Sequence, residues 1–295
     1  MAISRRRHSS IASGSCALVL ALVGLAGAPT AYASEDPQGG VPGNYTGADV
    51  SDPQDDRELT QQAKEKIALT EAWYAAQQGI SSQSSYTEQE EKFLKKYGLT
   101  KLSGENRSAL PAPASRLLPL THYGQSTSYY CGPATGAMMI KMVDGSIKSR
   151  YNGNAFGQGS LANSAHMNTA NAGLTDWSSK RFITGVNRWR GQNWYVQVPA
   201  PTASLTVKTV AHSIGENGMP VAADTVEFAN GRHYNGHPVN KTIGHWITAY
   251  GYSSNGATSN WADPSTTVWS GVNKTFSYNT SNFAGYFLQS NGIAY

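Results

Sequence analysis

The chain has 295 residues, of which 39% are hydrophobic and 14% are charged, and its formal net charge is +4. So small a positive charge, dispersed along the sequence without a recognised binding motif, argues against a nucleic-acid-binding surface. After the first 33 residues no apolar run is long enough to anchor the chain in a membrane. Two function classes remain for this protein: an enzyme and an interaction module.

Residues 1–33 have the organisation of a secretory signal peptide. They combine Arg5-Arg6-Arg7, an apolar stretch from Cys16 to Ala28 and the small-residue site Ala31-Tyr32-Ala33. This order predicts cleavage after Ala33 and release of the protein outside the cell, without a membrane anchor. Cys16 leaves with the signal peptide, so Cys131 is the one cysteine of the predicted mature protein.

Residues 34–116 differ in charge from residues 117–295. Acidic residues outnumber basic ones in the first segment, and the reverse holds in the second. Opposite charges favour docking of one segment on the other, although a solvated spacer would have the same composition. Residues 35–56 are rich in Gly, Pro and Asp and are predicted to be disordered.

A first helix is predicted from Arg57 to Gln78. Apolar residues recur there at helical spacing, Asp55 or Asp56 can cap the start, and Gly79 can end the helix.

A second helix is predicted to begin at Thr87 and to end at Gly98. Thr87-Glu-Gln-Glu90 has the form of a capping box, and residues 103–119 then return to linker composition. Two short helices and a protease-accessible linker in front of a larger domain predict that residues 34–116 are an acidic, partly helical pro-segment or a linker region, and an intramolecular pro-segment would keep a zymogen inactive.

Residues 117–295 suffice for one domain with a single buried core. Helical character follows Cys131 and ends at Gly145. Short β-branched or aromatic runs predict the strands Trp194–Val198, Pro220–Val226, His245–Tyr252, Thr267–Trp269 and Gly285–Leu288. A helix followed by strands predicts an α+β domain in which the helix packs on a mostly antiparallel sheet.

Cys131 points most directly to chemistry, because an unpaired thiol outside the cell is open to oxidation. At a helix N-terminus its thiolate would be stabilised by free backbone amides and the helix dipole, and Pro133 suits the first turn. Cys131 is therefore the predicted nucleophile. Gln125 is predicted to form an oxyanion hole with the Cys131 backbone amide, although alone it would be an ordinary loop residue.

The general base must come from elsewhere in the chain, and His245 is the predicted one. It begins the predicted strand 245–252, where a rigid element can aim its ring into a cleft. His233 and His237 are four apart, but Asn235-Gly236 between them predicts a hairpin loop, so neither a metal site nor a cofactor is expected. The remaining histidines of the mature chain are interpreted as structural or surface residues: His122, His166 and His212.

Asp263 is predicted to orient the base through the second ring nitrogen of His245. It is the only acidic residue after Glu227, and a turn and a return strand could bring it beside His245. Asn255 and Asn260 are possible substitutes. Asp263-Pro264 is also a common turn starter, which is the structural interpretation of the same residues.

The combined motifs resemble those of the papain-like cysteine peptidases: Gln125, Cys131-Gly-Pro-Ala, Gly244-His245 with a strand ending in Gly251-Tyr252, and Asp263-Pro264. More narrowly, they are similar to the bacterial bacteriocin-processing, double-glycine leader peptidase-like family. Residues 159–162 and 181–187 resemble the family's region between nucleophile and base, where a helix precedes a partner strand. The resemblance covers residues 117–295 and implies a papain-like fold with Cys131, His245, Asp263 and Gln125 in the roles given above.

Three functions compete. The favoured one is a secreted thiol hydrolase that cleaves a peptide or protein substrate through an acyl-thioester intermediate. The leader peptidases are fused to transporters and act in the cytoplasm, so their double-glycine substrate does not carry over. The alternatives are a papain-like acyl transferase or cell-wall amidase, and a catalytically inactive wall-binding module.

Overall fold

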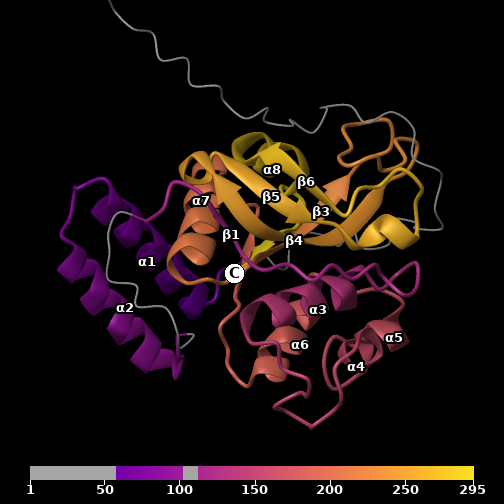
Figure 1. Ribbon diagram of the computed structural model, residues 1–295, viewed down its shortest axis with the longest axis horizontal. Coiled ribbons are helices and arrows are strands. Elements are labelled where there is room, and N and C mark those ends of the chain that lie inside the picture. Colours follow the sequence, from indigo (N-terminus) through magenta and orange to yellow (C-terminus); the bar gives the residue numbers. More distant parts are fainter. Residues whose placement is uncertain (1–57, 102–111) are drawn as a thin grey trace, which may run out of the picture. The chain divides into compact units, whose positions relative to one another are not determined.

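A seven-stranded antiparallel sheet is the centre of the computed structural model, which describes residues 58–101 and 112–295 (Figure 1). These residues belong to one compact unit. The strand order is β2-β7-β3-β4-β5-β6, and β1 pairs with β4 in addition. The strands are β1 Arg116–Leu117, β2 Gln197–Pro199, β3 Val221–Glu227, β4 Ile243–Ser253, β5 Thr258–Ala262, β6 Thr275–Asn279 and β7 Gly292–Ala294.

Helices lie on both sides of this sheet. In the view of Figure 1, the group α3 to α6 lies below the sheet and α8 lies above it. The bounds are α3 Cys131–Val143, α4 Gln158–Ala162, α5 Thr169–Ala172, α6 Arg181–Arg190, α7 Ala203–Val210 and α8 Thr280–Phe287. The short helical segments are η1 Ala211–Glu216, which continues α7, η2 Ser254–Gly256 and η3 Pro264–Thr267. The predicted α+β class with an antiparallel sheet is confirmed.

Strand β4 shows how the sequence positions the two layers. Successive strand side chains point to opposite faces of a sheet. Trp246 accordingly stacks on Phe182 of α6, with ring centroids 4.0 Å apart, whereas the adjacent His245 contacts the segment that follows β5. Trp246 of β4 therefore packs against the helical group, and the adjacent His245 points to the opposite face of the sheet.

Both predicted N-terminal helices exist, but they begin at other residues. Helix α1 spans Gln61–Gln77 and is capped by Thr60, not by an aspartate near residue 55. Helix α2 spans Gln83–Tyr97 and is capped by Ser82, so the predicted start at Thr87 is wrong. The Thr87 hydroxyl lies inside the helix and donates to the carbonyl of the residue four earlier. The predicted stop is confirmed, because Gly98 adopts φ 62°, a left-handed conformation that suits glycine.

The strand predictions were partly wrong after residue 253. The predicted strand 267–269 does not exist, because residue 267 is the last residue of η3 and the other two follow it. The predicted strand 285–288 is the end of α8. In α8, Asn279 caps the helix, and Phe283 and Phe287 share a face because they are four residues apart. Residues 181–187 lie in helix α6, which precedes strand β2, and the return strand expected before Asp263 is β5, whereas strands β6 and β7 were not predicted.

Helices α1 and α2 form a hairpin that packs on the rest of the unit through buried polar groups. Lys66 donates to the backbone oxygens of Trp194 and Tyr295 at 2.6 and 2.7 Å. The ring of His212 in η1 lies between the hydroxyls of Thr70 and Tyr86, at 3.0 and 3.1 Å. The hairpin is therefore docked by specific hydrogen bonds as well as by apolar contact.

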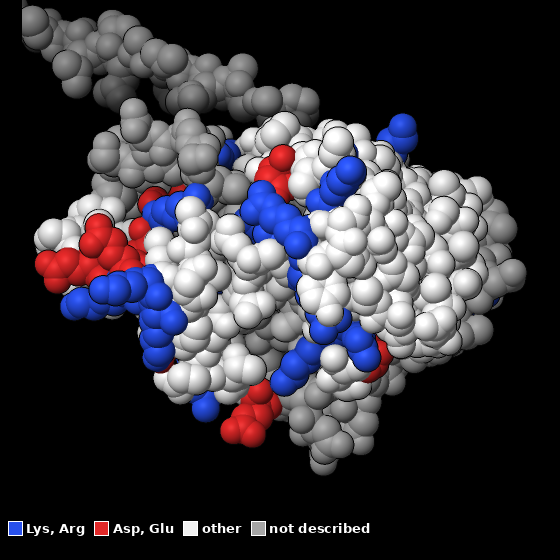
Figure 2. All heavy atoms as spheres, turned by 90° about the horizontal axis from the view of Figure 1, so that it is seen from below, with Lys and Arg blue, Asp and Glu red and all other residues white. Residues whose placement is uncertain are grey.

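Ion pairs between the hairpin and the rest of the unit lie near the surface. Lys208 pairs with Glu71 at 2.7 Å, and Lys101 lies 3.7 Å from Glu216. On the face shown in Figure 2, several Lys and Arg side chains form a band over the middle of the face, and a few acidic side chains lie beside basic ones. Partly exposed ion pairs like these two add little to stability, so the buried contacts contribute most of the free energy that holds the hairpin on the rest of the unit.

Several sequence predictions lie outside the described residues: the signal peptide 1–33, the disorder of 35–56, the caps Asp55 and Asp56, and residues 103–111 of the linker. Within 58–101 and 112–295, no helix has both the length and the apolar character needed to cross a membrane.

Candidate active site

Cys131 is the first residue of α3 and is completely buried. The preceding residue, Tyr130, makes no side-chain cap hydrogen bond to the helix. The N-terminus of a helix carries unpaired amides and a partial positive charge, so it stabilises a thiolate. The predicted placement of Cys131 at a helix start is confirmed.

Gly132 allows a second segment to lie directly against the start of α3. A Cβ at this position would lie 2.2 Å from Oγ1 of Thr175, which leaves no room for any side chain. The carbonyl of Thr175 in turn accepts the indole N–H of Trp246 at 2.8 Å. The segment around Thr175 therefore links the nucleophile end of α3 to the residue that follows His245.

Another hydrogen bond fixes α3 against β4. The Thr135 hydroxyl, one helical turn after Cys131, donates to the Trp246 carbonyl at 2.8 Å. The negative charge of a Cys131 thiolate also contributes to the raised pKa of Tyr234, after burial and the carboxylates of Glu227 and Asp263. Cys131 thus lies within electrostatic range of the polar cluster beside His245.

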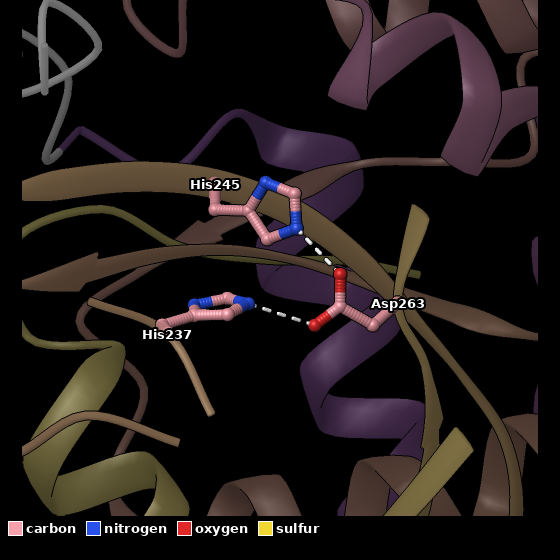
Figure 3. A group of neighbouring side chains, drawn as sticks. All are labelled: His237, His245 and Asp263. Carbon is pink, nitrogen blue, oxygen red and sulfur yellow. Dashed lines mark hydrogen bonds and ion pairs between the residues drawn. The ribbon is translucent and has the colours of Figure 1, made fainter. Parts of the chain in front are cut away.

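His245 and Asp263 form a buried hydrogen-bonded pair. His245 is the third residue of β4, not the first residue of a strand as predicted, and Asp263 directly follows β5. The antiparallel pairing of β4 and β5 brings them together, and Nε2 of His245 donates to Oδ1 of Asp263 at 2.9 Å (Figure 3). The two side chains are at most 1% exposed, so water screens their interaction little.

The carboxylate of Asp263 accepts hydrogen bonds from several sides. Ser265 donates to Oδ1 through its backbone amide at 2.8 Å and through its hydroxyl at 2.6 Å. Oδ2 accepts from Asn235 Nδ2 and from His237 Nε2, both at 2.9 Å. Asp263 therefore caps η3, as its turn interpretation predicted, and orients His245 with the same carboxylate.

Charge keeps Asp263 ionised in spite of its burial. Burial alone would raise the pKa of this carboxyl, but His237 and His245 hold it well below its usual range. Hydrogen bonds to the charged form act in the same direction. The carboxylate is thus negative throughout the neutral range.

His237 is the residue of this cluster that sequence reasoning missed. It lies in the loop between β3 and β4, as the Asn235-Gly236 turn predicted, but its side chain is completely buried. Nδ1 contacts Glu227 Oε1 at 2.5 Å, and Nε2 contacts Asp263 (Figure 3). The available signal was that Glu227 and Asp263 are the last two acidic residues of the chain and that His237 lies between them in sequence.

Gln125 lies in the segment that leads into α3, and its side chain is buried. Its backbone amide donates to the Pro264 carbonyl at 2.8 Å, and its carbonyl accepts from the Thr267 hydroxyl at 2.6 Å. Nε2 donates one of its two protons to the Thr127 carbonyl at 2.9 Å. Hydrogen bonds of the Gln125 backbone therefore hold this residue beside η3, the helix that Asp263 caps.

The remaining residues considered are the possible substitutes for Asp263 and the histidines interpreted as structural or surface residues. Asn260 accepts a hydrogen bond from Ser277, and Asn255 lies in η2. His122 contacts the Asp263 backbone oxygen at 2.7 Å, and His166 contacts Ser149 at 2.9 Å.

A metal ion is a poor fit for this cluster. His237, His245 and Asp263 each offer a ligand atom within 4.8 Å of the others. The Nε2 atoms of the two histidines, however, are already hydrogen-bonded to the Asp263 carboxylate at 2.9 Å. A metal would have to displace both bonds in a fully buried space, so these contacts favour hydrogen bonding between the three side chains.

Comparison with known proteins places the chain in a family. No curated protein matches the sequence. Residues 117–295 match the family model described as the Peptidase_C39 like family, which covers more than half of the chain. The helix on an antiparallel sheet agrees with a papain-like fold. The chain therefore belongs to the Peptidase_C39 like family.

Proposed function

We propose that this protein is a secreted cysteine peptidase that cleaves peptide bonds through an acyl-thioester intermediate. The observation that carries the proposal is the placement of Cys131 at the start of α3, which is bonded to β4 beside the buried His245–Asp263 pair. Nucleophile, base and orienting carboxylate thus come from three elements that the fold packs together.

In the first step, His245 accepts the thiol proton and the Cys131 sulfur attacks the carbonyl carbon of the substrate. The carbonyl oxygen becomes an oxyanion, and the electron pair returns as the C–N bond breaks. The His245 imidazolium gives its proton to the leaving amine, which leaves an acyl-thioester on Cys131. Water then loses a proton to His245 and attacks the thioester carbon, the C–S bond breaks to release the acid product, and the leaving sulfur takes the proton from His245, which restores the thiol.

Gln125 and the Cys131 backbone amide are proposed to stabilise the oxyanion. Since the Thr127 carbonyl takes one Nε2 proton of Gln125, the second proton can serve this purpose. Removal of one such donor typically lowers kcat about a hundredfold to a thousandfold. Gln125→Ala should therefore lower kcat in this range with a smaller change in KM.

Access is part of the proposal, because Cys131 and His245 are completely buried. A substrate can reach the sulfur only if the residues that cover it move. The ratio of the iodoacetamide rate to the rate of a bulky maleimide should accordingly be larger at Cys131 than with free cysteine.

The decisive test is the alkylation rate of Cys131 as a function of pH, measured beside peptide-library cleavage. A free thiol titrates near pH 8.5, whereas a thiolate paired with imidazolium reacts several pH units lower. We expect reactivity to persist at about pH 5 and to be lost in His245→Ala. His166→Ala, which removes another buried histidine, is the matched control and should leave the profile unchanged.

Each alternative gives a different result in the same experiment. Ordinary thiol titration in both proteins, with no turnover and with wall binding that survives Cys131→Ala, would overturn the peptidase proposal in favour of a binding module. A low-pH thiolate without peptide cleavage, but with solubilised peptidoglycan, would indicate a cell-wall amidase or acyl transferase.

Export and the pro-segment are tested by sequencing the N-terminus of the protein recovered from culture medium. A start at Ser34 would support cleavage of the signal peptide alone. A start near residue 117 would support removal of residues 34–116 as a pro-segment. Retention of Met1 on protein found only inside cells would contradict secretion.

A further inference from the structure

His237 is unusual among loop residues in that its ring is completely enclosed. The loop between β3 and β4 begins with the exposed Phe228, yet His237 is 0% exposed. The loop is held by Glu227, which accepts the Tyr234 amide at 3.0 Å, and by the backbone bond from Asn230 to Val239 at 2.7 Å. The ring is therefore fixed by the structure around it.

Each ring nitrogen of His237 faces a carboxylate. Nδ1 contacts Glu227 Oε1 at 2.5 Å, and Nε2 contacts Asp263 Oδ2 at 2.9 Å and the Ser265 hydroxyl at 3.1 Å. An ionised carboxylate can only accept hydrogen bonds, and a neutral imidazole has only one N–H to donate. Both contacts are satisfied together when His237 is an imidazolium.

We propose that His237 is a positioning residue for the proposed peptidase reaction, in which its buried imidazolium holds the Asp263 carboxylate ionised and aimed at His245. This inference rests on the proposed function, which assigns His245 as the general base and Asp263 as its orienting carboxylate. His237 touches neither substrate nor the reacting atoms in this scheme, and it acts through Asp263.

The charges around the ring explain why a cation is needed. The groups that face it are Glu227 from β3, Asp263 ahead of η3, His245 from β4, Tyr234 from its own loop and Trp269 after η3. Without the imidazolium, two buried carboxylates would lie near each other, and like charges at close range drive one of them to take up a proton.

Electrostatics agree with this geometry. Burial lowers the pKa of His237, but Glu227 and Asp263 more than offset it and raise the pKa to about 10. The ring therefore stays protonated through the neutral range. A protonated Asp263 could no longer stabilise the imidazolium form of His245, so the charge of His237 supports the charge of the base.

The first experiment measures the protonation of His237 directly in the full chain. Long-range ¹H–¹⁵N spectra of a ¹⁵N-histidine-labelled Cys131→Ala protein should show both nitrogens of His237 protonated at pH 8. His212, which contacts hydroxyls instead of carboxylates, is the internal control and should be neutral in the same sample. A neutral His237 tautomer at pH 8 would overturn the proposal.

The second experiment measures the pH profile of Cys131 alkylation in His237→Gln and in the double variant His237→Gln with Glu227→Gln. We expect the acid limb of the single variant to move up by at least about one pH unit, a tenfold lower rate on that limb, because Asp263 then competes with Glu227 for a proton. The double variant removes the competing carboxylate and should move the limb back. A merely structural role would lower the folded fraction without shifting the limb.

Failure of this inference is separable from failure of the proposed function, because alkylation needs no substrate. If the acid limb stays in place in the folded single variant, His237 does not position Asp263, whatever the activity. If the limb shifts and the double variant restores it while no peptide is cleaved, the positioning role stands and the peptidase proposal fails.

Discussion

Two buried histidines of this protein, His212 and His237, each have a polar partner at both ring nitrogens, but the partners differ in charge. His212 lies between the hydroxyls of Thr70 and Tyr86 and stacks on Trp73, with ring centroids 5.1 Å apart. Burial, together with Lys66 and Lys101, lowers its pKa to about 3. For His237, two carboxylates outweigh the same burial and raise the pKa to about 10.

The comparison teaches that the neighbours, and not burial alone, decide the charge of an enclosed histidine. A hydroxyl can donate or accept, so it satisfies a neutral ring, whereas a carboxylate can only accept and requires a donor. The hairpin is therefore docked through a neutral histidine, and the candidate active site is built around a charged one.

The largest expected effect comes from His237→Ala. Removing the cation leaves the two carboxylates buried without the positive charge that lay between them, and breaking a buried ion pair in this way typically costs about 3–5 kcal/mol of unfolding free energy. Urea denaturation at pH 7 would measure it. His233→Ala, in the same loop, is the control, since that ring contacts only the backbone oxygens of Gly231 and Lys241. Equal losses in both variants would show that the charge of His237 is unimportant for stability.

The pH dependence of stability should divide between the two histidines. His212 has a lowered pKa, so the unfolded chain binds a proton that the folded one does not, and stability falls as pH drops below 6.5. His237 has a raised pKa, so its contribution is complete below pH 6.5 and is lost as pH rises toward 10. Each limb is at most about 1.4 kcal/mol per pH unit.

Denaturation midpoints at pH 4.5, 7 and 9 would check this division. We expect His212→Phe to flatten the acid limb and His237→Gln to flatten the alkaline one. Asp263, whose pKa is lowered, loses its contribution only as pH falls below its unfolded value of 3.8, so it adds little to the change between pH 7 and pH 4.5. An alkaline limb unchanged in His237→Gln would count against the raised pKa.

A smaller effect is expected from Thr70→Val, which keeps the shape of the side chain. It removes the hydroxyl that contacts His212 and that also donates to the Lys66 carbonyl at 3.1 Å. Leaving a buried ring nitrogen without its partner costs about 1–3 kcal/mol. Thr87→Val, at an exposed position of α2, provides the control. A cost no larger than that of the control would show that the hairpin is held by apolar packing alone.

The smallest effect is expected from Glu71→Gln. Its ion pair with Lys208 joins the hairpin to α7, but the Glu71 side chain is 46% exposed. Partly exposed pairs of this kind contribute about 0–1 kcal/mol and weaken with salt. The change in unfolding free energy at low and high salt would measure it, and a loss of several kcal/mol would mean that surface charge docks the hairpin.

The sequence by itself determined the α+β class, the start of α3 at Cys131, and the strands β3 and β4. These features follow from local patterns, such as helical or alternating spacing and a glycine stop, that are readable within one segment. The pairing of His245 with Asp263 was also predicted, because Asp263 was the only carboxylate downstream, and the structure joins the two residues.

Only the tertiary structure decided what the loops and short elements do. Residues 285–288 became the end of a helix because Phe283 and Phe287 pack on Tyr234, at 5.4 and 5.1 Å between ring centroids. The sequence predicted only that His237 lies in a hairpin loop, since nothing local reveals that Glu227 and Asp263 will enclose it. Contacts between residues far apart in sequence set its burial and charge, and such contacts exist only once β3, β4 and β5 have paired.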